Sequence, residues 1–284
     1  MFTEFSGIYE KSLNWLRLIG RSEIRIKVLI LLIDGAKNIR ELRGHLNLPS
    51  PTILHAMRGM EDEGLIENTK GEYSLTNIGM VQAIGIRDLA DTIAVLFQNK
   101  NFWLNHDISG IPFQFLKSIG VLADCEFVKA TPDDLLRPLS SFVQLTQRAS
   151  ELKGVFSVVY PGLSDTLKSL LENGAEVEFI LTRTVFEKVM EGDIQFLDLL
   201  MEKTASKELK LWIIDDDPMI SFGVTDSVLS FSLFLEDGTY DTSTELVSYS
   251  DEALRWGKDL IKYYIEMAKA VEPNDIKNKY VPII

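Results

Sequence analysis

Residues 22–75 contain three successive helix patterns followed by the pattern of a short hairpin, and few folds have this order of elements. An almost continuous apolar run over 22–35 lies between Ser22, an N-cap residue, and Gly35, a residue type that ends helices. A second, shorter pattern over 38–49 begins at an Asn residue and repeats its apolar positions at spacings of three and four. The first pattern predicts a helix covered on both sides, and the second predicts a helix with one buried stripe.

The stretch SPTILHAMRGMEDEGLI, residues 50–66, predicts the third helix. Ser50 is expected to cap it, and Pro51 fits the first helical position, where its missing N–H is not needed. Leu54 and Ala56 are expected on an exposed face, where they either meet a thymine methyl or pack. The expected buried stripe consists of Ile53, Met57 and Met60, continued by Leu65.

Residues 65–75 complete the pattern with a two-stranded hairpin. LIEN and YSL are short strand signals, and TKGE between them places a glycine where the turn favours positive φ. Helix, helix, third helix and hairpin is the order of a winged helix-turn-helix, whose third helix lies in the major groove of DNA. Over about residues 10–85 the chain resembles the winged helices of ArsR-like and MarR-like regulators.

That resemblance implies DNA contacts for a set of polar side chains. Thr52 and Arg58 are expected at base edges or phosphates, because a hydroxyl and a guanidinium suit these partners. The second helix is expected to contact the DNA backbone, and the tip of the hairpin is expected to reach an adjacent phosphate or the minor groove. The candidate DNA-binding residues are Arg40, Arg43, Ser50, Thr52, His55, Arg58 and Lys70.

The distribution of charge decides whether DNA is a reasonable partner. The net charge of −13 opposes it, because phosphates repel an acidic surface. Residues 1–86, however, hold ten basic and ten acidic side chains, so all the excess acid lies in 87–284. Within 10–60, nine basic side chains stand against four acidic ones. A locally basic module therefore precedes an acidic body, and double-stranded DNA is the expected partner.

The run IGMVQAIGIRDLADTIAVLFQNK, residues 78–100, predicts a long helix with one apolar face. This face either packs on its own chain or joins two copies. Winged helices usually act in pairs on a symmetric DNA site, so a homodimer is expected. The expected face consists of Val81, Ile84 or Gly85, Leu89, Ile93, Leu96 and Phe97.

The rest of the chain contains apolar runs that predict strands. GVFSVVY, the helical LSDTLKSLLENG and AEVEFIL follow one another as strand, helix and strand, which favours a parallel core. Later runs, with turns at Asp215–Pro218 and Thr225–Asp226, predict antiparallel hairpins, and 251–270 predicts a closing amphipathic helix. The predicted fold class is mixed α/β.

Four segments of this part are more distinctive: FWLNHDISGIP, KGVFSVVYP, VEFILTRTVFEKV and FLEDGTYDTSTELVSYSDEALRWGKDLIKYY. They resemble archaeal regulators that join a winged helix to a methanogenesis-regulatory-protein middle domain. The resemblance implies a transcription regulator whose sensor domain is similar to a non-catalytic phospholipase-D-like fold. The expected domains are a winged helix at 1–84, linker and dimerisation helices at 85–125, an α/β sensor at 126–270 and a tail at 271–284.

Sequence motifs argue against catalysis. Phospholipase-D chemistry needs histidines in His-x-Lys, and none of the three histidines stands in that pattern. No Walker A loop, dinucleotide-binding turn or His-Glu-x-x-His helix occurs either. No enzymatic activity, cofactor or metal is therefore expected, while the Asp215–Asp217 run has two interpretations, a turn or a cation site. A hydrolase of unknown type fused to a winged helix and a winged-helix protein-interaction module are the alternative functions.

The sensor domain is expected to bind a small molecule or a protein signal. Open α/β sheets hold ligands at the carboxyl ends of parallel strands, which places the expected pocket there. His106 either contacts the ligand or is hydrogen-bonded beside the N-cap of a helix. The candidate ligand-binding residues are His106, Tyr160, Thr182, Asp215 and Tyr240.

Three further features predict a cytoplasmic protein without a membrane partner. No uninterrupted apolar run reaches about 18 residues, the length of a membrane span. The first sixteen residues lack the basic and apolar layout of a signal peptide. A single cysteine, Cys125, fits a reducing compartment and is expected to act as a small core side chain.

Overall fold

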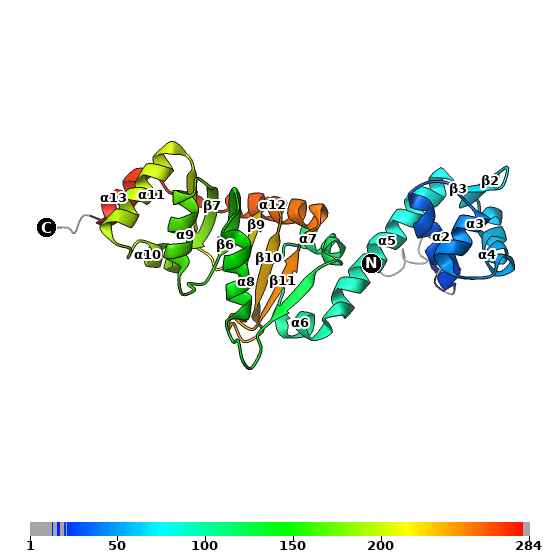
Figure 1. Cartoon of the computed structure of the whole chain (residues 1–284), viewed down its shortest axis with the longest axis horizontal. Coiled ribbons are helices and arrows are strands. Elements are labelled where there is room, and N and C mark those ends of the chain that lie inside the picture. Colours follow the sequence, from blue (N-terminus) through cyan, green and yellow to red (C-terminus); the bar gives the residue numbers. More distant parts are fainter. Residues whose placement is uncertain (1–12, 14–15, 18–19, 21, 281–284) are drawn as a thin grey trace, which may run out of the picture. The chain divides into compact units, whose positions relative to one another are not determined.

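The computed structural model describes residues 13, 16–17, 20 and 22–280 (Figure 1). The chain divides into two compact units after Ala90, inside the stretch 85–125 that was expected as a linker. Most of the N-terminal stretch expected to lack a signal peptide lies outside the described residues. Among the helices that the structure describes, none is both long and apolar enough to span a bilayer.

The first unit is a set of helices closed by a small antiparallel sheet. Its elements are α2 (Glu23–Ile33), β1 (Lys37–Asn38), α3 (Ile39–Leu46), α4 (Ser50–Asp62), β2 (Ile66–Thr69), β3 (Glu72–Leu75) and the beginning of α5 (Asn77–Gln98). Strand β3 lies between β1 and β2 and pairs with both. This order of helices and hairpin confirms the winged helix-turn-helix.

Local signals explain where these helices begin. Ser22 caps α2 by accepting a backbone N–H at 3.4 Å, as expected. Asn38 caps α3 in a complete capping box with Glu41. The expected cap at Ser50 is wrong, because Ser50 is already helical and Pro49 is the N-cap residue, with no side-chain hydrogen bond.

The core of the first unit lies between α2, α4 and the hairpin. All four members of the predicted stripe are buried, namely Ile53, Met57, Met60 and Leu65. They face buried side chains of α2, namely Val28, Leu29 and Leu32. The expectation that Leu54 and Ala56 are exposed is wrong: Ala56 is buried and Leu54 is half-buried against this core. Ala56 follows Ile53 by three residues, a helical spacing that turns it to the buried side.

Gly79, in the first turn of α5, marks a close approach between α5 and the hairpin. A Cβ added there would overlap the carbonyl oxygen of Leu65, a backbone atom that cannot turn aside. We expect Gly79→Ala to destabilise the chain by about 1–3 kcal/mol, the usual cost of overpacking. Gly85→Ala on the same helix is the matched control, because nothing lies within 4 Å of its added atom.

The control substitution is expected to act in the opposite direction. Alanine favours the helix interior over glycine by roughly 0.5–1 kcal/mol, so Gly85→Ala should stabilise the chain. Urea unfolding of both variants measures the two effects. Equal unfolding midpoints for Gly79→Ala and the parent chain would refute the close approach.

The second unit is built on one large sheet with helices on both faces. Its elements are α6 (Lys100–Asn105), β4 (His106–Asp107), α7 (Phe113–Leu116), the 3-10 helix η1 (Ile119–Leu122), β5 (Glu126–Lys129), α8 (Arg137–Thr146), β6 (Glu151–Phe156), α9 (Leu163–Glu172), β7 (Glu176–Thr182), α10 (Arg183–Val189), α11 (Ile194–Ser206), β8 (Leu209–Ile214), β9 (Ile220–Thr225), β10 (Leu229–Leu235), β11 (Thr244–Ser248), α12 (Asp251–Ile265), β12 (Lys269–Ala270) and α13 (Pro273–Tyr280). The strand order is β12-β8-β7-β6-β9-β10-β11-β5, and β4 pairs with β10.

Strand pairing confirms part of the predicted topology and corrects another part. Strands β6, β7 and β8 are parallel, with α9 between the first two, as the strand-helix-strand pattern predicted. The hairpin at Thr225–Asp226 is confirmed, since β9 pairs with β10. The hairpin expected at Asp215–Pro218 is wrong. Strand β8 already pairs with β7 and β12, so β9 crosses the sheet and pairs with β6 and β10.

Alternating side chains build a separate core on each face of this sheet. Along β6, Leu152 and Phe156 join the core formed with α9, α10 and α11, whereas Val155 joins the core formed with α12. Two layers of helices around one sheet confirm the mixed α/β class. The stretch expected as a tail contributes α13, which packs on α11 and buries Ile276 completely.

Candidate nucleic-acid interface and ligand pocket

The exposed side of α4 carries three of the side chains expected to read DNA. Thr52, His55 and Arg58 are exposed and follow one another at spacings of three, so they lie along one side of the helix. We call these three side chains the α4 face. Ser50 is half-buried at the start of the helix. The acids at 61–63 lie at the other end, away from the N-terminal turns that usually contact bases.

The remaining DNA-binding candidates flank α4 within the same unit. Arg40 and Arg43 are exposed on α3, which packs against α4. Lys70 is exposed at the tip of the β2–β3 hairpin. Lys70 and Gly71 have φ of 56° and 92°, the backbone of a two-residue primed turn, and Asn68 accepts the Gly71 N–H at 2.9 Å. The turn therefore holds the lysine at the outermost point of the hairpin.

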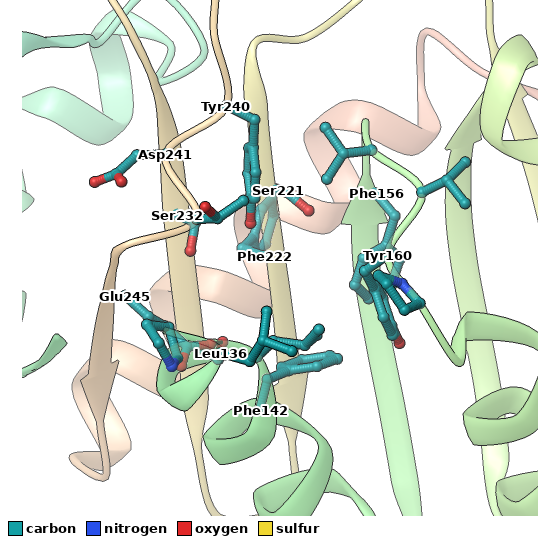
Figure 2. Close-up of a pocket in the computed structure, with 17 residues that line it drawn as sticks. Leu136, Phe142, Phe156, Tyr160, Ser221, Phe222, Ser232, Tyr240, Asp241 and Glu245 are labelled. Carbon is teal, nitrogen blue, oxygen red and sulfur yellow. Dashed lines mark hydrogen bonds between the residues drawn. The ribbon is translucent and has the colours of Figure 1, made fainter. Parts of the chain in front are cut away.

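In the second unit, a cavity of about 340 Å³ lies beside α8 and strands β6, β9, β10 and β11 (Figure 2). Figure 2 shows Phe156 and Tyr160 on one side and Ser232, Asp241 and Glu245 on the other. The apolar lining consists of Leu136, Pro138, Leu139, Phe142, Phe156, Val158, Val159, Tyr160, Pro161 and Phe222. The polar lining consists of Ser221, Ser230, Ser232, Tyr240, Asp241, Thr242 and Glu245.

The polar wall arises from an alternation inside two buried strands. Phe222 of β9 and Phe231 of β10 belong to the core shared with α12. Their neighbours Ser221, Ser230 and Ser232 point to the opposite face and line the cavity, although all three are buried. In the sequence, MISFGV and VLSFSLFL are among the later apolar runs that predict strands. The serines at alternate positions of these strands are the signal from which the polar wall could have been predicted.

Glu245 on β11 has the most unusual environment in the pocket. Its side chain is buried, with 4% of the residue exposed. The Ser230 hydroxyl donates to Oε1, while Oε2 has no hydrogen-bond partner among the described residues. Burial raises the pKa of Glu245 to about 7, and the Ser230 hydrogen bond opposes this only in part. Near neutral pH this carboxyl group therefore gains and loses its proton readily.

His106 is hydrogen-bonded to Asp241, the second carboxylate of the pocket. Its Nε2 lies 3.1 Å from Asp241 Oδ2, and its Nδ1 lies 2.6 Å from the Phe102 carbonyl oxygen. Both ring nitrogens therefore face oxygen atoms, and these two contacts fix the orientation of the ring. Burial alone would raise the pKa of Asp241, but hydrogen bonds from His106 and Ser243 lower it to about 2. Asp241 is therefore ionised, and His106 positions it without lining the cavity.

The structure places the other predicted ligand residues in different surroundings. Tyr160 and Tyr240 line the pocket. Thr182 accepts a backbone N–H at 3.4 Å and caps α10, and Asp215 is also absent from the lining. The cavity reaches the carboxyl end of the parallel strand β6, where Phe156 and Tyr160 line it. From there it extends over the antiparallel strands β9–β11, and the residues at the ends of β7 and β8 do not line it.

Ion pairs account for the acidic turn after β8. Asp215 lies 2.5 Å from Arg183 Nη2 and 2.9 Å from Lys269 Nζ. Hydrogen bonds from Lys269 and Arg183 lower the pKa of this exposed carboxyl. Asp217 accepts the Met219 N–H at 3.0 Å and so shapes the turn. Within the described residues, no group of three or more possible metal-ligating side chains occurs here or elsewhere.

Helix α5 has residues in both units. Its last turns are fixed in the second unit, where Trp103 Nε1 donates to the Val95 carbonyl oxygen at 2.9 Å. Gln98 Nε2 donates to the Cys125 carbonyl oxygen at 2.7 Å, and Cys125 is buried with its pKa raised to about 12 by burial. The apolar face that the sequence predicted stays largely exposed along the helix. The exposed side chains of the predicted face are Val81, Ile84, Leu89, Ile93, Leu96 and Phe97, and Ile78, before them on the same helix, is exposed as well.

Comparison with protein families gives two matches to this chain. The N-terminal domain of the methanogenesis regulatory protein FilR1 matches residues 13–94, and the middle domain of the same protein matches residues 135–267. The chain carries the N-terminal and middle domains of the FilR1 family. The FilR1 N-terminal domain contains α4, and the FilR1 middle domain contains every residue that lines the pocket.

A curated relative is similar to most of this chain, and two solved structures are similar to it more weakly. The methanogenesis regulatory protein FilR1 of Methanothrix harundinacea (strain 6Ac) is 27% identical over 263 residues, 92% of this chain. The chain spans 58% of the length of that relative. TrmBL2, described as an archaeal chromatin protein with a novel mode of DNA binding, has a TM-score of 0.42 and 15% identity, covering 86% of this chain and 91% of TrmBL2.

Phosphatidylserine synthase from Haemophilus influenzae Rd KW20 has a TM-score of 0.40 and 14% identity, covering 54% of this chain and 40% of the synthase. Likenesses of this size add nothing to the fold, which rests on the strand order and the two cores described above. The likeness of the second unit to a phospholipase-D-like domain therefore stays a prediction.

Proposed function

We propose that the chain is a DNA-binding transcription regulator that reads double-stranded DNA with α4 and binds a small-molecule effector in the pocket beside α8. The observation that carries this proposal is the α4 face, exposed polar and basic side chains on the third helix of a winged helix. Two further observations support this proposal: the excess of basic over acidic side chains in residues 10–60 and the name of the FilR1 relative.

The pocket favours a sensor over a hydrolase. Histidine, lysine and cysteine are absent from the described residues that line it, so it offers no usual nucleophile with a histidine base. Its polar groups instead surround an apolar cavity, the usual composition of a binding site. We therefore assign binding, with no catalytic step, to this pocket.

A chain of contacts connects the pocket with the end of α5. Asp241 in the lining binds His106, His106 binds the Phe102 carbonyl, and Phe102 packs edge-on against Trp103, which donates to α5. Ligand binding at Asp241 can thus change the contacts that fix the end of α5 in the second unit. A coupling of about 1–3 kcal/mol between effector and DNA would be ordinary for such a regulator, and it must act in both directions.

We further propose a homodimer formed through the apolar face of α5. Val81 and Phe97 are 72% and 69% exposed, and a row of exposed apolar side chains on one helix is typical of an interface. We expect Leu89→Glu, near the middle of this row, to weaken the dimer at least about tenfold, or about 1.4 kcal/mol. Analytical ultracentrifugation over a concentration series measures this change.

The matched control for the dimer is Ile194→Glu. Like Leu89, Ile194 has an exposed apolar side chain, 61% exposed, but it lies on α11. This variant should dimerise like the parent chain. A parent chain that sediments as a monomer, or a Leu89→Glu variant that dimerises normally, would remove α5 from the interface.

Recovery of genomic DNA tests the proposed function as a whole. The full chain is mixed with sheared DNA of its source organism, and the bound fragments are sequenced. The proposal expects a small set of fragments that share one site, with the two halves of the site related by symmetry. Recovery of fragments without a common site, or of no DNA at all, would contradict sequence-specific regulation.

A further inference from the structure

The pocket contains acidic side chains but no basic ones. Asp241 and Glu245 line it, whereas lysine, arginine and histidine are missing from its described lining. A ligand carboxylate or phosphate would face two carboxyl groups without a counter-charge. Burying an anion without a partner is costly, so the pocket disfavours anionic ligands.

One buried oxygen defines where a ligand donor would sit. The Ser230 hydroxyl already donates to Oε1 of Glu245, and Oε2 remains without a partner among the described residues. A buried acceptor without a partner destabilises the folded chain, and a hydrogen-bond donor at this position would remove that cost. Glu245 lies on the wall opposite Tyr160 (Figure 2), so such a donor would enter from the cavity.

The other polar groups suit the same donor. The pKa of Tyr240 is raised to about 12 by burial, so its hydroxyl stays neutral and can both accept and donate. Across the cavity, Phe142, Phe156 and Tyr160 supply aromatic rings. Aromatic faces attract cations as well as apolar groups, so this wall accepts a positively charged ligand.

We propose that the pocket binds a small organic cation, with a protonated amine on Oε2 of Glu245 and an apolar body against the aromatic wall. This inference rests on the proposed function only in taking the pocket as the effector site. A cavity of about 340 Å³ falls within the range of small-molecule sites, about 300–1,000 Å³. Asp241, whose carboxylate is bound by His106, gives the site a second acceptor for the amine.

The proposal predicts a specific pH dependence of ligand affinity. The pKa of Glu245 is about 7 without a ligand, and a bound amine favours the ionised carboxylate. Affinity for the amine should therefore rise about tenfold from pH 6 to pH 8, as the carboxyl group loses its proton. A neutral ligand that accepts a hydrogen bond from protonated Glu245 would show the opposite trend.

Calorimetry with the full chain and three matched indole compounds tests the ligand class. Tryptamine carries a cation, tryptophol is neutral and indole-3-acetate is an anion. We expect tryptamine to bind at least about tenfold more tightly than tryptophol at pH 8, and indole-3-acetate not to bind. Equal affinities for tryptamine and tryptophol, preference for indole-3-acetate, or no binding of tryptamine would each overturn the proposal.

Two variants assign the effect to one side chain. Glu245→Gln should remove both the preference for tryptamine and the rise of affinity with pH. Glu236→Gln, an exposed glutamate that does not line the pocket, should keep both. The pH dependence of the unaltered chain decides the matter if Glu245→Gln fails to fold. Because these titrations contain no DNA, their failure leaves the proposed DNA binding standing, and that activity is tested separately.

Discussion

Replacing His55 and Arg58 together by alanine is expected to weaken operator binding by about 2–6 kcal/mol, from about 1–3 kcal/mol for each lost base contact. Both side chains are exposed on α4, and neither contributes to the buried core of the first unit. The variant should therefore keep the fold while it loses the contacts that distinguish bases. Fluorescence anisotropy with the recovered genomic site measures the affinity.

The matched control removes basic side chains from the other unit. Arg255 and Lys262 are exposed on α12, and their double replacement by alanine removes two positive charges, no fewer than the replacement of His55 and Arg58 removes. This control should bind the operator with nearly the parent affinity. If the His55 and Arg58 variant bound as tightly as this control, α4 would not be the reading helix.

Replacing Glu245 by glutamine is expected to stabilise the ligand-free chain at pH 8 by up to about 3 kcal/mol. The pKa of this carboxyl rises from its ordinary 4.5 to about 7 in the folded chain. Its contribution to stability is therefore complete below pH 4.5 and is lost as pH rises through about 7. At about 1.4 kcal/mol for each pKa unit, the ionised carboxylate costs the folded state about 3 kcal/mol at pH 8.

Glutamine avoids this cost because it stays neutral and its oxygen can still accept from Ser230. Urea unfolding at pH 5 and pH 8 measures the effect. The parent should lose more stability over this interval than Glu245→Gln, and the exposed control Glu236→Gln should behave like the parent. A Glu245→Gln variant that is less stable than the parent at pH 8 would contradict the burial of a carboxyl group without a partner for Oε2.

The winged helix was predictable because its signals are local. The cap at Asn38, the stripe of Ile53 and Met57 and the turn at Gly71 each depend on a few neighbouring residues. The order of the large sheet was not predictable in the same way. The turn at Asp215–Pro218 looks like a hairpin locally, but β9 pairs elsewhere because distant strands occupy both sides of β8.

Local sequence patterns do not predict the pocket, for a similar reason. Tyr160 and Tyr240 were expected near a ligand, and they line the cavity together with residues from four strands and α8. Tyr160, Thr182 and Asp215 were chosen from an analogy with parallel sheets, and of these three only Tyr160, just after β6, lines the cavity, which extends over antiparallel strands. The polar wall was visible in principle, as Ser230 and Ser232 alternate with apolar residues in β10. Only the fold shows that α8 covers this face.

Salt-dependent binding of the full chain to duplex DNA tests the proposed function most directly. Fluorescence anisotropy between about 50 and 200 mM salt measures the affinity for the recovered site and for a scrambled duplex. The account predicts tighter binding to the site than to the scrambled duplex, an affinity that falls steeply with salt, and loss of the preference in the His55 and Arg58 variant. Equal affinity of the folded chain for both duplexes, or no binding to either at the lowest salt, would contradict it.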